Sequence, residues 1–207
     1  RLSKDEYLTL LMDADSTKRQ IRKTRYCLTY ENQYFEIDVY PFWDNQATIE
    51  LELTDENQEI KIEPLKLEDY HKCSNIWNMK AQPLAEKWRG EIASGNRLVF
   101  VYKINGEFIG EGALVLDTGD PDYTIDGQRV YVSRMIVKKE YRNRGIGSTI
   151  LEFLIKKAKE MGFSEMTIGV DKDNVNALHL YRKFGFTEVL FDGADEQGEY
   201  LKLMKYI

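Results

Sequence analysis

The chain has 207 residues, 43% of them hydrophobic and 12% aromatic, which is enough apolar material for a core and excludes disorder over most of its length. Lys and Arg total 29 against 35 Asp and Glu, and the net charge of −6 argues against nonspecific nucleic-acid binding, which needs excess cations to neutralise phosphates. The longest apolar run, 150–155, is interrupted by Glu152 and is far shorter than the roughly 20 residues of a membrane helix.

Cysteine and histidine are both scarce. Cys27 and Cys73 have no metal-ligand spacing, so we expect neither a metal site nor a disulfide scaffold, and we expect a reducing, cytoplasmic location. His71 and His179 are too few for a zinc site built on several histidines. Because the chain begins with Arg1 and shows no signal peptide, we expect a processed product or an excised fragment.

The first part of the chain predicts a short helix and a small antiparallel sheet. The helix is expected over about 4–12, and the strands over about 21–30, 33–40 and 48–54. Each strand segment alternates apolar and charged residues with a period of two, which gives the sheet one apolar and one ionic face. The turn-like residues 55–58 and the change in charge near Pro64 favour a first domain over 1–62 and a second over 63–207.

The second part mixes helices and strands, as in an α/β (α+β) domain. A helical stretch broken around Pro83 is expected first, and then a hairpin that turns at Asn105-Gly106, which is a strong hairpin signal. A loop with four aspartates follows. The remaining expected elements are a strand at 130–137, a helix at 146–161, a strand at 165–170, a helix at 175–184 and strands at 187–191 and 200–206.

The segment 142–147, Arg-Asn-Arg-Gly-Ile-Gly, lies between a predicted strand and an amphipathic helix. Glycines in such a turn let backbone N–H groups approach a ligand, and the helix adds the positive end of its dipole. Four cations, Lys138, Lys139, Arg142 and Arg144, surround it. The pattern predicts a pyrophosphate site, with an ordinary solvated turn as the alternative. The third glycine of the dinucleotide-binding fingerprint is missing.

Two segments resemble the signatures of the GNAT N-acyltransferases. Residues 135–147 are similar to the acyl-CoA-binding core of that family, which carries a Gln/Arg-x-x-Gly-x-Gly/Ala turn after its fourth strand. Residues 174–186 resemble its second signature, an Asn-x-x-Ala helix that ends in Tyr-x-x-x-Gly-Phe. The resemblance implies a GNAT fold over 63–207, with a central mixed, mostly antiparallel sheet flanked by helices. It also implies transfer of an acetyl group from acetyl-CoA (coenzyme A) to an amine, by direct attack in a ternary complex.

The resemblance also implies roles for single residues. Tyr181 would place its hydroxyl near the coenzyme A sulfur and protonate the departing thiolate, although packing against Ala177 and Phe184 is the alternative. Asn174 would contact the cofactor, or cap its helix, or do both. The cofactor-binding set is completed by Met135, Ile136 and Val137 along the pantetheine arm and by Arg142, Asn143, Arg144, Gly145, Ile146 and Gly147 around the pyrophosphate.

The general base is open. Some relatives place a glutamate on the fourth strand, where this chain has Tyr131. Glu111 on the preceding strand is our candidate, acting through water, and an ordinary exposed carboxylate is the alternative. The aspartates of the loop at 117–127 are candidates for steering a cationic amine, with a solvated turn as the alternative.

The N-terminal segment resembles the later strands of a CYTH domain, the fold of the triphosphate tunnel metalloenzymes. The resemblance implies a polyphosphate and a divalent metal, magnesium or manganese, held by Lys23, Arg25, Glu36, Asp38, Glu50 and Glu52. The family's opening strand is absent, so at most a partial CYTH-like barrel is expected. We favour a structural remnant whose open edges are covered by the acyltransferase, by a second copy in a homodimer, or by further chain.

The sequence therefore predicts an acetyltransferase with a small-molecule amine or peptide amine as acceptor, and neither nucleic acid nor membrane as a partner. Two alternatives belong to other classes. One is a non-catalytic acyl-CoA-binding sensor. The other assigns the main activity to metal-dependent triphosphate binding or hydrolysis by the N-terminal segment.

Overall fold

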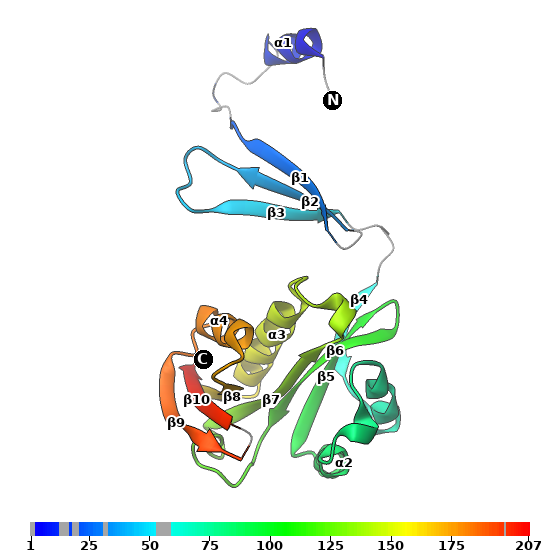
Figure 1. Ribbon diagram of the computed structural model, residues 1–207, viewed down its shortest axis with the longest axis vertical. Coiled ribbons are helices and arrows are strands. Elements are labelled where there is room, and N and C mark those ends of the chain that lie inside the picture. The colour runs from blue at the N-terminus through cyan, green and yellow to red at the C-terminus, as the bar shows by residue number, and fades with distance from the viewer. Residues whose placement is uncertain (1–2, 13–16, 18–20, 31–32, 53–58, 197) are drawn as a thin grey trace. The chain divides into compact units, whose positions relative to one another are not determined.

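The computed structural model describes residues 3–12, 17, 21–30, 33–52, 59–196 and 198–207. It divides into two units, Arg1–Gln58 and Glu59–Ile207 (Figure 1). The expected turn at 55–58 lies outside the described residues. In the part of the chain that is described, no helix is long and apolar enough to cross a membrane.

The first unit contains the expected helix and the expected small sheet. Helix α1 (Lys4–Met12) begins with a reciprocal cap, in which the Glu6 N–H donates to Oγ of Ser3 and the Ser3 N–H donates to the Glu6 carboxylate. Strands β1 (Thr24–Tyr30), β2 (Gln33–Val39) and β3 (Ala47–Glu52) form an antiparallel sheet in that order. The three predicted strands are therefore confirmed.

One face of this small sheet is an ion-pair network centred on Asp38. The Asp38 carboxylate is fully buried and accepts two hydrogen bonds of 2.7 Å from Arg25 and another from Lys23. These bonds, that from Arg25 first, hold the pKa of the Asp38 carboxyl well below its usual range. Arg25 also pairs with Glu36 and Glu50, whereas the side chain of Glu52 lies outside the described residues. Among the described residues, no group of acidic, cysteine or histidine side chains is arranged to hold a metal ion.

The second unit is built on a seven-stranded sheet with the order β4-β5-β6-β7-β8-β10-β9. All neighbours are antiparallel except β7 and β8, which are parallel. The strands are β4 (Ile60–Pro64), β5 (Arg97–Ile104), β6 (Glu107–Val115), β7 (Arg129–Val137), β8 (Glu165–Asp171), β9 (Glu188–Asp195) and β10 (Gly198–Tyr206). Strand β4 spans the boundary expected at residue 62 and pairs with β5, so this stretch belongs to the larger sheet.

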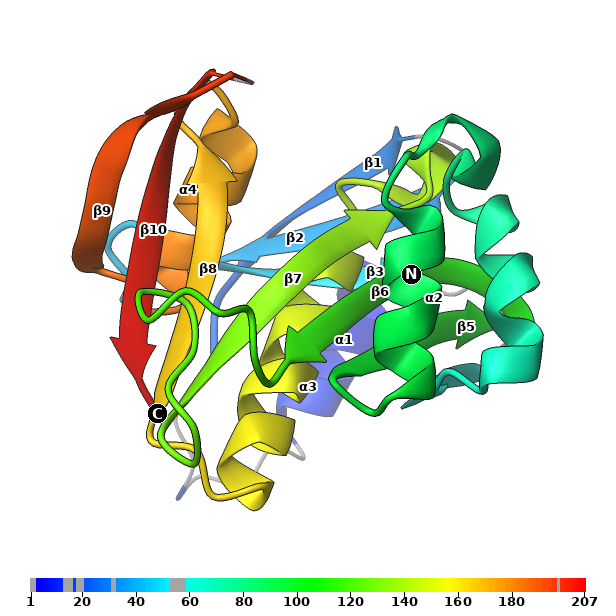
Figure 2. The ribbon, with the colours of Figure 1, turned by 90° about the horizontal axis from the view of Figure 1, so that it is seen from below.

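Helices cover both faces of the larger sheet (Figure 2). Helices α3 (Ile146–Glu160) and α4 (Val175–Lys183) pack on one face over the larger apolar core. The other face carries α2 (Ala85–Ala93) and the 3-10 segment Leu67–Asn75 over a second core. Short 3-10 turns lie at Met79–Ala81 and Lys139–Tyr141. The helical stretch expected before residue 94 is therefore broken into three pieces, at Leu67–Asn75, Met79–Ala81 and Ala85–Ala93.

Candidate functional site

The parallel pair at the centre of the larger sheet separates towards its C-terminal end. Strands β7 and β8 pair only from Arg129 opposite Glu165 to Val132 opposite Ile168, and Figure 2 shows them diverging beyond that point. A bulge in β7 accompanies the separation. The backbone angle φ of Arg134 is 52°, in the left-handed region, and one extra residue of β7 is accommodated there opposite β6. The sheet is therefore open between its two central strands.

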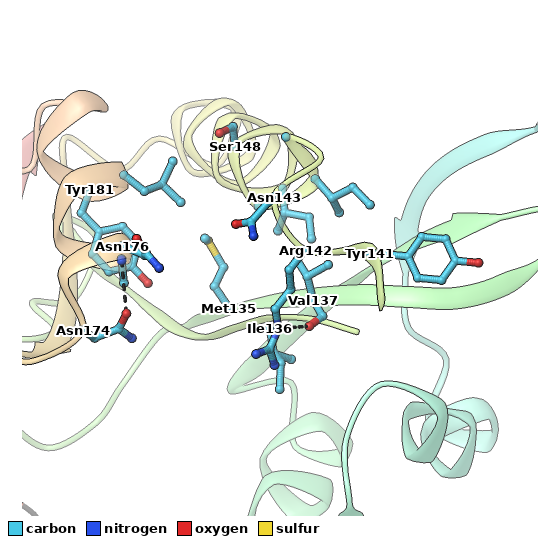
Figure 3. A pocket seen from close by; sticks show the side chains of 16 residues that line it. Met135, Ile136, Val137, Tyr141, Arg142, Asn143, Ser148, Asn174, Asn176 and Tyr181 are labelled. Carbon is cyan, nitrogen blue, oxygen red and sulfur yellow. Dashed lines mark hydrogen bonds between the residues drawn. The ribbon is translucent and has the colours of Figure 1, made fainter. Parts of the chain in front are cut away.

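A pocket of about 440 Å³, which we call the main pocket, lies at this opening (Figure 3). Its wall comes from three parts of the fold, namely the C-terminal end of β7, the turn at 142–147 with the first residues of α3, and one face of α4. The lining residues are Met135, Ile136, Val137, Tyr141, Arg142, Asn143, Gly145, Ile146, Gly147, Ser148, Ile150, Asn174, Asn176, Ala177, Leu180 and Tyr181. Of the predicted cofactor-binding residues, the structure places all except Arg144 in this lining.

The turn at 142–147 presents backbone donors to the main pocket. Gly145 is the N-cap of α3 with φ of 76°, and no side chain caps the helix. The Thr149 N–H donates to the Gly145 carbonyl at 3.0 Å, so the N–H groups of Ile146, Gly147 and Ser148 precede the first intrahelical bond. A Cβ added to Gly145 would meet no atom within 4 Å, which leaves this backbone open to a ligand. Such a helix start binds phosphate groups.

The four predicted cations divide into different roles. Arg142 lines the main pocket, and its Nε donates to the Val137 carbonyl at 3.0 Å, which ties the turn to the end of β7. Lys138 pairs with Glu107 at 2.8 Å instead, and Lys139 lies outside the lining. The Arg144 guanidinium stacks over the Tyr141 ring at 5.2 Å and lies outside the lining. Arg142 is therefore the cation of this set that contributes directly to the pocket wall.

Helix α4 contributes both of its predicted residues. Oδ1 of Asn174 accepts the Ala177 N–H at 3.2 Å, so this residue caps α4 and also lines the main pocket. Tyr181 is only 8% exposed, and burial raises the pKa of its hydroxyl to about 12. No group in the described part of the chain hydrogen-bonds to that hydroxyl. It therefore keeps its proton at neutral pH and is available to a bound ligand.

The structure places Glu111 away from the main pocket. It lies on the opposite face of the sheet, 4% exposed, where its Oε1 accepts a hydrogen bond of 2.9 Å from Nε of Arg134. It lines a separate small cavity with Trp77 and Trp88. Glu111 is therefore a buried, ion-paired residue and not an exposed strand carboxylate.

Two aspartates of the acidic loop are paired with a lysine from the core. Buried Lys202 donates to Asp120 at 2.6 Å and to Asp122 at 3.0 Å. Tyr123 packs against the Tyr131 ring with 4.3 Å between centroids, which fastens the loop to β7. Two of the four aspartates expected to steer an amine thus serve to hold the loop.

Sequence reasoning missed several residues of the main pocket. Asn176, Ala177 and Leu180 come from α4, between one and five residues before Tyr181, and line the pocket with it. Their spacing from Tyr181 is the signal that could have found them. Tyr141 and Ser148, which flank the turn, could only be assigned once the path of the chain was known.

Comparison with known proteins defines the class. The model of the acetyltransferase (GNAT) family matches residues 61–186. An uncharacterised N-acetyltransferase of Lactobacillus delbrueckii subsp. lactis is 31% identical over 121 residues, which are 56% of this chain and 69% of that protein. The N-alpha-acetyltransferase MAK3 of Arabidopsis thaliana is 30% identical over 142 residues, 66% of this chain and 72% of that protein.

Solved structures agree on the fold. The ribosomal-protein-S18-alanine N-acetyltransferase of Escherichia coli superposes with a TM-score of 0.59 at 20% identity, over 72% of this chain and 94% of that one. A GNAT family acetyltransferase of Elizabethkingia anophelis, solved with acetyl-CoA bound, superposes with a TM-score of 0.51 at 20% identity, over 72% of this chain and 98% of that one.

The chain belongs to the GNAT acetyltransferase family, whose typical acyl donor is acetyl-CoA. The expected fold, a GNAT domain with a separate small N-terminal sheet, is confirmed. The family match does not extend over the first unit, and the comparisons give its resemblance to CYTH domains no support.

Proposed function

We propose that the second unit transfers the acetyl group of acetyl-CoA to an amine by direct attack in a ternary complex, and that the main pocket binds the donor. The observation that carries the proposal is that the uncapped start of α3 and the free Tyr181 hydroxyl belong to one pocket wall. A coenzyme A thioester needs donors for its pyrophosphate at one end of the pocket and a hydroxyl that can donate to its sulfur at the other.

The lining residues fit that donor. The N–H groups at the start of α3 and the Arg142 side chain would hold the pyrophosphate, while the backbone of Met135–Val137 would hold the pantetheine arm. Acetyl-CoA supplies a thioester, whose acyl carbon accepts an amine with a thiolate as the leaving group. The open side of β7 supplies backbone N–H groups that can stabilise negative charge on an acyl oxygen.

Tyr181 is the proposed acid. Its pKa of about 12 keeps the hydroxyl protonated throughout the physiological range, so it can donate a hydrogen bond to a developing thiolate. Because an ordinary thiol has a pKa of about 8.5, full proton transfer from this tyrosine is not downhill. We therefore assign to Tyr181 stabilisation of the leaving sulfur as its charge develops, which is when a positioned donor contributes most.

The acceptor is proposed as a primary amine, either of a small molecule or of a peptide N-terminus. The relative from Arabidopsis thaliana is named an N-alpha-acetyltransferase, and this chain covers 72% of it, which supports a peptide amine. We also propose that the first unit is a structural domain joined to the catalytic one. Both described cysteines are free thiols, which suits the expected cytoplasmic location.

The test is a screen of amines, polyamines, aminoglycosides and peptide N-termini with detection of the free thiol. Acetyl-CoA-dependent thiol release with one acceptor class supports the proposal. Tyr181→Phe should then lower kcat by about 10²-fold or more with unchanged affinity for acetyl-CoA, as for loss of a hydrogen-bond donor to a developing charge. Tight acetyl-CoA binding with no turnover on any amine would instead favour a sensor of acyl-CoA.

A further inference from the structure

The bulge in β7 holds a side chain with unusual surroundings. The Arg134 guanidinium carbon lies 3.7 Å from the ring centroid of Trp77 and 4.5 Å from that of Trp88. Its Nε donates to Glu111 at 2.9 Å, and the two side chains are 16% and 6% exposed. Arg134 lies on β7 and Glu111 on β6. Trp77 follows the segment Leu67–Asn75, and Trp88 lies on α2. We call this group of four residues the arginine clamp.

The arginine clamp spans the bulge itself. Between the pairs Ala113–Ser133 and Glu111–Ile136, strand β7 has Arg134 and Met135 where β6 has only Gly112. Glu111 thus lies on the partner strand beside the extra residue, and its bond to Arg134 joins the two strands where their backbone ladder is interrupted. A non-glycine residue with φ of 52° persists only where its surroundings hold it.

The bulge also determines which residues face the main pocket. One extra residue shifts the alternation of side chains along β7. Arg134 therefore points to the face of α2, while Met135 lies against Gly112 on the face of α3, with its Cγ 3.3 Å from where a Cβ of that glycine would be. Met135, Ile136 and Val137, which follow directly, line the main pocket.

We infer that Arg134 is a positioning residue for the acyl donor. Packed against the rings of Trp77 and Trp88, which meet edge to face, and bonded to Glu111, it fixes the bulge that sets the backbone of Met135–Val137 along the main pocket. The inference rests on the proposed function, because it assigns that backbone to the pantetheine arm. It also gives Glu111 a role through Arg134, in place of that of a base.

Two ligands separate positioning from mere stability. Acetyl-CoA uses the β7 backbone and the turn at 142–147, whereas its pantetheine-free fragment, adenosine 3′-phosphate 5′-diphosphate, uses the turn alone. Arg134→Gly removes the side chain but tolerates the left-handed backbone. We expect this variant to bind acetyl-CoA about tenfold more weakly in calorimetry, as for a small displacement of a binding group, and the fragment with unchanged affinity. Arg134→Lys, which keeps the charge without the planar guanidinium, should not restore acetyl-CoA affinity.

A second variant covers the risk that loss of Arg134 disturbs folding. Glu111→Gln keeps an acceptor oxygen and should weaken acetyl-CoA selectively, by about threefold, without the loss of kcat and of the acidic limb of the pH profile that removal of a base would cause. Asn105→Gly, at another non-glycine left-handed residue in the β5–β6 turn, is the control and should leave both affinities unchanged.

The outcomes are distinct. Acetyl-CoA affinity of Arg134→Gly within twofold of the unmodified protein would overturn the inference, and so would equal weakening of both ligands. A base-like loss of kcat in Glu111→Gln would overturn it as well. If the unmodified protein binds neither ligand, the proposed function itself is overturned, together with the inference that rests on it.

Discussion

Gly112 on β6 lies so close to Ile150 on α3 that a Cβ added to the glycine would be 2.8 Å from Cγ2 of the isoleucine. Leu154 Cδ1 would be 2.9 Å away as well. Helix α3 therefore rests directly on the backbone of β6, next to the bulge. The contact fixes the helix whose first turn forms part of the main pocket.

Gly112→Ala should destabilise the second unit by about 1–3 kcal/mol, because an extra methyl group in a packed core forces the helix or strand to move. The free energy of unfolding from urea denaturation measures this. Gly90→Ala is the matched control, since a Cβ there meets nothing within 4 Å and the residue lies inside α2. That change should stabilise by about 0.5–1 kcal/mol. Equal effects of both changes would contradict close packing at Gly112.

Gly145→Glu should abolish binding of coenzyme A. The new side chain would enter the space in front of the α3 donors, and its carboxylate would repel a diphosphate. Calorimetry with coenzyme A measures the loss. Gly162→Glu is the control, because Gly162 follows the same helix, with φ of 89° and open space around it. Both variants carry similar backbone strain, about 1–2 kcal/mol, so unaltered affinity in Gly145→Glu would exclude the turn as the phosphate site.

The pH dependence of turnover follows from the raised pKa of Tyr181. A group that acts while protonated is in its active form at every pH below its pKa, here about 12. The contribution of Tyr181 to kcat should therefore be constant from about pH 6 to about pH 10. The upper limit equals the ordinary tyrosine pKa, at which an unperturbed group would already be half ionised. The measurement compares kcat of the unmodified protein and Tyr181→Phe across that range. A ratio that has fallen by about half at pH 10 would show an ordinary tyrosine pKa of about 10 and contradict the burial argument.

Lys202→Met should release the acidic loop. It removes the two hydrogen bonds to Asp120 and Asp122, whose side chains are 37% and 41% exposed and can be rehydrated, so the cost is about 1–2 kcal/mol. Limited proteolysis within 117–127 should accelerate. Lys172→Met, at a more exposed lysine that pairs with Asp192, is the control and should leave cleavage of the loop unchanged.

The small N-terminal sheet should lose stability in acid. The folded-state pKa of Asp38 is depressed, so its contribution is present above the unfolded value of about 3.9 and is lost as pH falls below it. Hydrogen exchange of the β1 and β2 amides between pH 6 and 3 measures the effect. Asp38→Asn should lower stability at pH 6 and flatten the dependence, whereas an unchanged slope would assign the acid sensitivity to other groups.

Local chemistry made much of the site predictable. The turn at 142–147 and the cap at Asn174 depend on residues close in sequence, so their glycines and side chains identify them directly. The strands of the first unit could likewise be predicted, from their alternation of apolar and charged residues. The same locality explains why the N-terminal helix and the Asn105-Gly106 hairpin were predicted correctly.

The rest depended on contacts between distant segments. Glu111 could not be placed from its own strand, because its partner Arg134 turns towards it only through the extra residue in β7. The pairing of the loop aspartates joins Asp120 to a lysine 82 positions later, which no local pattern encodes. Strand β4 was not predicted, and the boundary expected at residue 62 from charge and Pro64 falls within it, because its pairing with β5 joins residues distant in sequence.

The separation of β7 from β8 leaves a gap between two neighbouring strands at the centre of the sheet. Beyond Val132 the backbone of β7 no longer pairs with β8, so a donor bound there would bridge the two halves of the sheet. Ligand that binds only the folded chain at 100 times its Kd adds about 2.7 kcal/mol to stability. Heat resistance of this unit should therefore rise and fall with the supply of its own substrate.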